Sequence, residues 1–250
     1  MKTILLAGIL VSCAAAQIPT EPPNLIRVVR NGSIQPYADG KAAVNVLGMS
    51  ATSGLSETWM LELHDSFGSL EDLDKALKTV ASARPPSENA ALLPDDVLAP
   101  SRAVVGVYRP ALSYLPGQAI RIFPTARYFD IMVCRIRPGS EADFAGLVKL
   151  REFRFDSINL DRPEIVYQVI SGAPSGTYIF LAPLPSLRMM DNGRPFTPTY
   201  AEGVEAAARK KAADTEIARQ HLWFRIEPRM SYVSEEFASP DPGFWHPTPR

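Results

Sequence analysis

The feature that most constrains this 250-residue chain is an internal repeat with a period of about 118 residues. Three short patterns recur in the same order, at offsets of 118 or 119, then 117, then 118 residues. Each match is weak by itself, but three ordered matches at nearly one offset are difficult to produce by chance. The sequence therefore predicts two divergent copies of one structural unit. The matched pairs are Ser53-Gly54 and Thr58-Trp59 with Ser171-Gly172 and Thr177-Tyr178, Ser69-Leu70 and Asp74 with Ser186-Leu187 and Asp191, and Pro110 and Leu112-Ser113-Tyr114 with Pro228 and Met230-Ser231-Tyr232.

The second copy shows its secondary structure more clearly than the first. Residues 128–136 have the pattern of a strand, residues 140–159 that of a helix capped by Ser140, and residues 165–170 and 177–182 that of a hairpin. A short helix is expected from Ser186, and a capping box at Thr199 and Glu202 opens a helix predicted to run to about Gln220. Residues 222–226 complete the unit as a strand. This order, β-α-β-β-α-β, is that of a ferredoxin-like unit.

The first copy follows the same order with one difference. Strands are predicted at residues 26–29, 46–51, 57–63 and 103–108, and a helix at residues 69–81. Only about 24 residues separate Val29 from Ser53, against 38 between Val133 and Ser171. We therefore expect the first helix of this copy to be shortened or partly lost. Such an asymmetry favours a single functional site over a matched pair.

Two such units have a natural way to pack, because each antiparallel sheet carries helices on one face and leaves the other needing cover. The predicted fold class is α+β, with two tandem ferredoxin-like repeats packed sheet to sheet as a pseudo-dimeric α/β barrel around a small cavity. Over residues 25–233 the chain resembles the dimeric α/β-barrel superfamily, in a single-chain version from an exported bacterial branch. The resemblance rests on the element order, on the repeated Ser-Tyr after the last strand, and on Arg137-Pro138-Gly139 and Tyr167-Gln168-x-x-Ser171-Gly172. The superfamily includes cofactor-free monooxygenases and haem enzymes, so the fold leaves the function open.

The predicted boundaries are an export signal at residues 1–16, a proline-rich linker at 17–24, the first repeat at 25–115, a second linker at 116–125, the second repeat at 126–233 and a C-terminal tail at 234–250. Lys2, a short apolar run and the alanines at 14–16 are typical of a signal peptide. Cys13 follows a lipobox-like Leu10-Val11-Ser12, so lipidation of Cys13 is the alternative and would anchor the protein to a membrane. We expect a periplasmic or extracellular protein without a transmembrane span.

Composition and motifs narrow the function classes. A net charge of −1, from 26 basic and 27 acidic residues that are well mixed, argues against nucleic acid as a partner. Cys134 is the only cysteine after the signal, so it is interpreted as a core residue without a disulfide partner. The sequence indicates no cofactor and no metal, because it lacks a phosphate loop, a dinucleotide fingerprint, a hydrolase elbow and histidines at metal-ligand spacing.

Four residues are candidates for ligand binding, and no catalytic residue is assigned. His64 and Asp65 are expected at the end of a hairpin strand, where a barrel cavity could open. A haem ligand or a general base is one interpretation of His64, and a histidine paired locally with Asp65 is the other. Trp59 and Tyr178 are predicted at equivalent strand positions, either in the core or against a ligand.

The two remaining histidines have plainer interpretations. His221 is interpreted as a helix-end residue favoured by the helix dipole. His246 lies in an aromatic tail that is expected to pack on its own domain, the alternatives being the barrel mouth or a partner.

Three functions remain open at this stage. The first is an exported protein that binds a small apolar ligand or a partner through the barrel. The second is a cofactor-free monooxygenase-like enzyme, which requires an apolar cavity with a polar group placed for proton abstraction. The third is a haem-dependent enzyme that uses His64. The oligomeric state is left open.

Overall fold

The computed structural model describes residues 20–32, 44–54, 56–78, 97–98, 102–157, 160, 162–191 and 202–247. The predicted export signal, the lipidation candidate Cys13 and the segment of the expected shortened helix (33–43) lie outside these residues. Within them, no helix combines the length and the apolar character that crossing a membrane requires.

Each repeat contributes four strands to the structure. The first repeat contains β1 (Leu25–Arg30), β2 (Asn45–Ala51), β3 (Thr58–His64), α1 (Phe67–Lys78) and β4 (Ala103–Tyr108). The second contains β5 (Tyr128–Ile136), α3 (Glu141–Ser157), β6 (Ile165–Ser171), β7 (Thr177–Leu184), η4 (Leu187–Met190), α4 (Glu202–Thr215) and β8 (Glu216–Ile226). Between them lie η2 (Pro110–Leu112), α2 (Pro116–Ile122) and η3 (Phe123–Thr125), and after them η5 (Pro228–Met230), α5 (Glu235–Ala238) and α6 (Pro242–Trp245).

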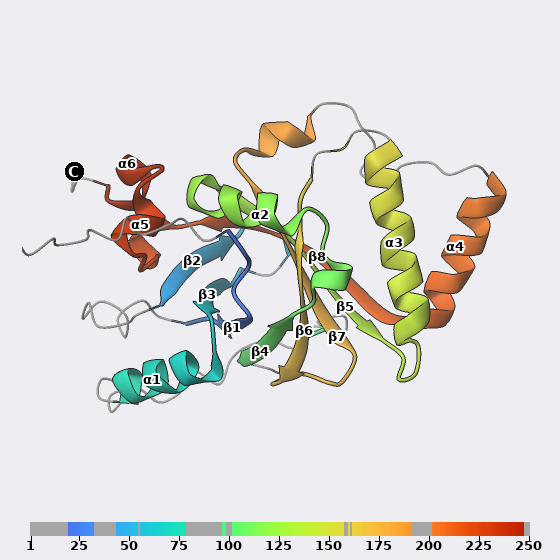
Figure 1. Ribbon diagram of the computed structural model, residues 1–250, viewed down its shortest axis with the longest axis horizontal. Helices are drawn as coiled ribbons and strands as arrows, with labels where there is room; N and C mark the ends of the chain where they lie inside the picture. Colours follow the sequence, from blue (N-terminus) through green and yellow to red (C-terminus); the bar gives the residue numbers. More distant parts are fainter. Residues whose placement is uncertain are drawn as a thin grey trace, which may run out of the picture.

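The eight strands close into one antiparallel barrel in the order β1-β3-β2-β8-β5-β7-β6-β4. Each repeat therefore keeps the ferredoxin-like strand order, β4-β1-β3-β2 in the first and β8-β5-β7-β6 in the second. The two sheets join edge to edge, β2 to β8 and β4 to β6. Helices α3 and α4 lie side by side against the second repeat, whereas α1 lies at the opposite end of the molecule (Figure 1). The predicted α+β barrel is confirmed.

Alternating side chains of the strands fill the barrel interior. On β5, Phe129, Ile131 and Val133 are fully buried in the main core, while Asp130 and Met132 point to the outer face. An eight-stranded barrel is just wide enough for side chains to fill it. The largest side chains of the main core with less than 2% exposure are Trp59, Tyr167, Phe123, Phe129 and Phe224.

The repeated serine-tyrosine pattern forms the two seams between the repeats. After β4, the Ser113 hydroxyl accepts from the backbone N–H of Val166 on β6 at 2.9 Å. After β8, the Ser231 hydroxyl accepts from the backbone N–H of Gly48 on β2 at 3.0 Å. The following tyrosines extend both seams, since Tyr114 bridges to Glu164 and Tyr232 to Val46. The repetition of this pattern is thus explained by its structural role in holding the two sheets together.

The boundary between α4 and β8 differs from the prediction. The helix was expected to run to about Gln220, but it ends at Thr215 and the strand begins at Glu216. Residues 216–221 pair with β5, where His221 lies opposite Met132 and Glu216 opposite Ile136. Pairing with a neighbouring strand therefore overrides the local helix preference of this segment.

The segment between the repeats and the C-terminal tail pack together at one end of the barrel. Residues 116–125, expected as a linker, form α2 and η3 and bury Ile120 and Phe123. The indole N–H of Trp245 donates to the carbonyl of Pro124 at 2.7 Å, and Arg127 forms an ion pair with Asp241. The tail thus packs on the domain it belongs to.

Candidate functional site

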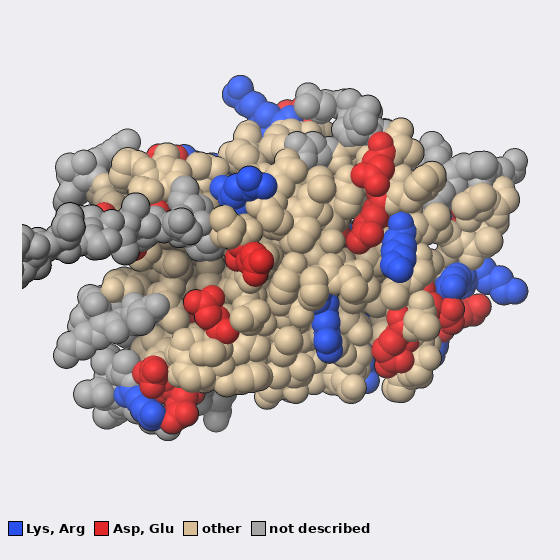
Figure 2. Space-filling view, viewed as in Figure 1, with Lys and Arg blue, Asp and Glu red and all other residues tan. Residues whose placement is uncertain are grey.

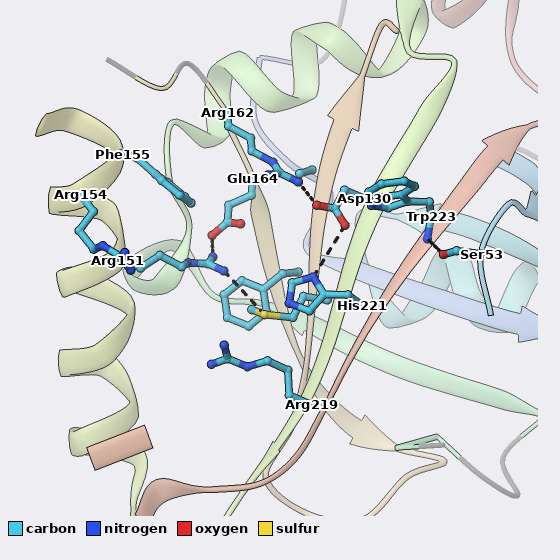
Figure 3. A pocket seen from close by; sticks show the side chains of 13 residues that line it. Ser53, Asp130, Arg151, Arg154, Phe155, Arg162, Glu164, Arg219, His221 and Trp223 are labelled. Atoms are coloured by element: carbon cyan, nitrogen blue, oxygen red, sulfur yellow. Dashed lines mark hydrogen bonds and ion pairs between the residues drawn. The ribbon is translucent and has the colours of Figure 1, made fainter. Parts of the chain in front are cut away.

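A cavity of about 500 Å³ lies on the outer face of the second repeat, between the wall formed by β5, β7 and β8 and helix α3 (Figure 3). The cavity predicted between the two sheets is not found there, because apolar side chains of the described residues pack that space. The volume is within the range of small-molecule sites. Its apolar lining consists of Met132, Phe155, Phe180, Ala182 and Trp223.

The cavity gathers more positive than negative charge. Four arginines line it, against two carboxylates, and the arginine on β8 also forms an ion pair with Glu216, which is outside the lining. Arg151 forms an ion pair with Glu164, and Arg162 forms one with Asp130. Over the face of the molecule drawn in Figure 2, by contrast, acidic and basic side chains are interspersed. The other two arginines of the cavity are Arg154 on α3 and Arg219 on β8.

Burial changes the acid–base properties of these groups. Burial lowers the pKa of Arg151 to about 10, and the positive charge of Arg219 adds to the effect. Burial also lowers the pKa of Arg162. The pKa of His221 falls to about 4, first through partial burial and then through the positive charges of Arg219, Arg151 and Arg162. His221 is therefore neutral at neutral pH, and the arginines keep their charge.

Asp130 and His221 lie close together in this cavity. The Asp130 carboxylate is 8% exposed as a residue, and its Oδ2 pairs with Arg162. Its Oδ1 lies 3.9 Å from Nδ1 of His221 and has no hydrogen-bond partner within the described part of the chain. Figure 3 shows the two side chains facing each other from neighbouring strands.

The four candidate residues from the sequence do not meet in this cavity. His64 is fully buried on β3 of the first repeat; its Nε2 lies 3.1 Å from Glu62 Oε2 and its Nδ1 3.2 Å from Ser69 Oγ. Asp65 is exposed, and its backbone carbonyl accepts from Asn24. The local partners of His64 are therefore Glu62 and Ser69, not Asp65.

Trp59 and Tyr178 lie on opposite faces of the barrel wall. Trp59 packs inside, 4.6 Å from the ring of Phe224, whereas Tyr178 packs outside, 4.8 Å from Phe144 of α3. In the strand pairing the counterpart of Glu62 is Ala182, 120 positions later, whereas Trp59 and Tyr178 are 119 positions apart. A slip of one residue moves a strand side chain to the other face. The predicted equivalence of these two positions is therefore wrong.

Sequence reasoning missed the residues that do line the cavity. His221 was interpreted as a helix-end residue, but it lies within β8. The alternation Arg219, His221, Trp223 was the signal for a strand with one polar face. Asp130, one acidic residue in an otherwise apolar strand, was a second signal. Among the residues described, no group of three histidine, cysteine or acidic side chains is arranged to hold a metal ion.

Comparison with known proteins shows a likeness of fold. No protein-family model and no curated protein sequence matches the chain. Among solved structures, it is similar to an anthrone oxidase-like protein, with a TM-score of 0.54 and 12% identity over 83% of this chain and 93% of that one. It is also similar to a proposed monooxygenase from Fusobacterium nucleatum, with a TM-score of 0.50 and 9% identity over 81% of this chain and 91% of that one. At such low identity, what these proteins and this chain share is the single-chain α+β barrel.

Proposed function

We propose that this protein binds a small organic anion with a flat apolar body in the cavity between α3 and the wall formed by β5, β7 and β8. The observation that carries the proposal is the excess of arginines over carboxylates on an aromatic lining. This revises the expectation of a purely apolar ligand held by the barrel interior.

Two contacts indicate how such a ligand would be held. The guanidinium of Arg151 lies 4.7 Å from the ring centre of Phe180 and 5.4 Å from that of Phe155, so charge and aromatic surface are already combined in the cavity. An anion near the buried arginines would also reduce their mutual repulsion. The apolar part of the ligand would cover Met132, Phe180 and Ala182 and remove them from water.

Calorimetric titration with 2-naphthoate and its neutral isostere 2-naphthamide tests this proposal. We expect the carboxylate to bind roughly tenfold more tightly, or better, because charge-assisted contacts to arginine are stronger than neutral ones. Replacement of Arg219 by methionine should weaken naphthoate binding, while Arg209→Met removes the same charge from the exposed face of α4 and should not. Equal affinity for 2-naphthoate and 2-naphthamide would contradict the proposal.

A second function is favoured by the Asp130–His221 pair. The unprotonated imidazole of His221 can accept a proton, which a cofactor-free oxidation by O₂ needs in order to form the substrate anion. Its lowered pKa makes it a weak base, so this function ranks second. The two similar structures named as an anthrone oxidase-like protein and a proposed monooxygenase support this choice at the level of the fold. The buried His64, with both ring nitrogens in contact with partners, gives no support to the haem alternative.

Oxygen uptake with anthrone as the probe tests this second function. If the Asp130–His221 pair abstracts the substrate proton, oxygen uptake should exceed the rate of the uncatalysed oxidation. The His221→Gln variant should show a smaller excess. If anthrone binds but oxygen uptake is not accelerated, the protein is a binding protein and the proposed oxidase activity is wrong.

A further inference from the structure

One oxygen atom of Asp130 faces the cavity without a donor. The residue is more than nine-tenths buried, and only its Oδ2 is engaged, by Arg162. Nothing within the described ranges donates a hydrogen bond to Oδ1. Burying an acceptor without a hydrogen-bond donor costs about 1–3 kcal/mol of folding free energy. A ligand that donates a hydrogen bond to this atom would recover part of that cost.

The neighbouring side chains leave room for that donor. Asp130 lies opposite Ala182 on β7 and opposite Trp223 on β8. The methyl group of Ala182 is too small to cover the carboxylate, and both Ala182 and Trp223 line the cavity. The space above Asp130 therefore opens onto the apolar surface that the ligand body would cover.

One oxygen atom can bridge Asp130 and His221 once the half-exposed imidazole turns aside, because Oδ1 itself has almost no exposed surface. Oδ1 and Nδ1 are 3.9 Å apart, which is too long for a direct hydrogen bond. An oxygen about 2.8 Å from each atom spans this distance. A hydroxyl in that position donates to Oδ1 and exchanges a second hydrogen bond with the neutral imidazole.

We propose that Asp130 is a specificity-determining residue, which selects ligands that carry an uncharged hydroxyl as well as the anionic group. This inference rests on the proposed function. The donor is uncharged because an ammonium group would enter a cavity lined by Arg151, Arg154, Arg162 and Arg219. The ligand class is a hydroxylated aromatic acid, with the acid held by arginine and the hydroxyl by Asp130.

The experiment compares 2-naphthoate, 6-hydroxy-2-naphthoate and 6-methoxy-2-naphthoate by calorimetry at pH 7. We expect the hydroxy acid to bind roughly tenfold more tightly than the methoxy acid, or better, which is the value of one hydrogen bond to a charged group. Asp130→Asn should remove this preference while 2-naphthoate binds as well as before or better, since a negative charge has been removed. Asp143→Asn makes the same chemical change at an exposed residue of α3 outside the cavity lining, and as the control it should keep the preference.

The outcomes separate this inference from the function on which it rests. Equal binding of the hydroxy and methoxy acids by the native protein overturns the role of Asp130, and this comparison needs no variant to fold. Survival of the preference in Asp130→Asn overturns it as well. Failure of all three acids to bind overturns the proposed function, and the inference with it.

Discussion

Arg27 of β1 and Asp130 of β5 occupy the same position in the two repeats. Arg27 lies opposite Glu62 on β3 and Val105 on β4, and Asp130 lies opposite Ala182 on β7 and Trp223 on β8. In the first repeat Arg27 donates to Glu62 at 2.6 and 3.1 Å and forms an ion pair with Asp74 of α1.

The second repeat has Ala182 where the first repeat has Glu62. In the first repeat the larger residue fills the space between sheet and helix with an ion cluster that also includes His64. In the second repeat the small residue leaves the space open above Asp130. The cavity described above therefore belongs to the second repeat, and the corresponding place in the first repeat is filled by the ion cluster.

Ala182→Leu should close the cavity without changing any charge. The larger side chain would occupy the space above Asp130, and we expect the affinity for 2-naphthoate to fall roughly tenfold or more. The measurement is calorimetric titration, with Ala182→Ser as the control of nearly unchanged volume. Undiminished binding by the leucine variant would place the ligand elsewhere on the protein.

Glu62→Gln should destabilise the protein far more than Asp74→Asn. Glu62 is fully buried between Arg27 and His64, so removal of its charge breaks a buried ion pair and costs about 3 kcal/mol or more. Asp74 is 47% exposed, so the same chemical change there costs less than about 1 kcal/mol. Urea unfolding measures both, and equal losses would show that the cluster does not depend on Glu62.

The strands were readable from the sequence, whereas the site was not. Alternating hydrophobic residues located all eight strands, and the repeat then implied the barrel, because two identical sheets must each cover an open face. The site depends on relations that no local pattern contains. Arg162 reaches Asp130 across the sheet, and the cavity has helix α3 as one wall and the small Ala182 where the first repeat has Glu62.

The errors in the sequence interpretation have physical causes of the same kind. An alanine-rich helix signal was extended through residues 216–220, because only pairing with β5 reveals that they form a strand. His64 attracted attention as a strand-end histidine, yet its partners come from Glu62 two positions away and from Ser69 of α1. In both cases packing against another element, which the sequence does not display, decided the outcome.

Ser113→Ala and Ser231→Ala should each weaken one seam of the barrel. Each change leaves a backbone N–H, of Val166 or of Gly48, without its side-chain acceptor, at a cost of about 1–3 kcal/mol. Unfolding in urea should show similar losses for the two variants, because the contacts are equivalent. Ser239→Ala, which removes an exposed hydroxyl in the tail, is the control and should stay within about 0.5 kcal/mol of the native protein.

His221 should make the stability of the protein depend on pH below neutrality. Its pKa is about 4 in the folded protein, against an ordinary value of 6.5, so the unfolded chain takes up a proton at a higher pH than the folded one. The contribution of His221 to the free energy of unfolding is therefore complete above pH 6.5 and is lost as the pH falls towards 4. Denaturant unfolding at several pH values in this window should give a shallower decline for His221→Gln than for the native protein.

Arg219→Met tests the cause of this pH dependence. Among the charged groups that face His221, Arg219, Arg151 and Arg162 lower its pKa, and Arg219 contributes most after burial. Glu216 raises the pKa, and the Asp130 carboxylate, 3.9 Å from Nδ1, also favours the protonated form. Removal of Arg219 should therefore raise the pKa of His221, which the pH titration of its ring protons in NMR measures. The pH range over which the free energy of unfolding declines should become narrower. An unchanged titration in Arg219→Met would show that Arg219 does not contribute to the lowered pKa of His221, and the cavity would then carry less positive potential at the imidazole than its arginines imply.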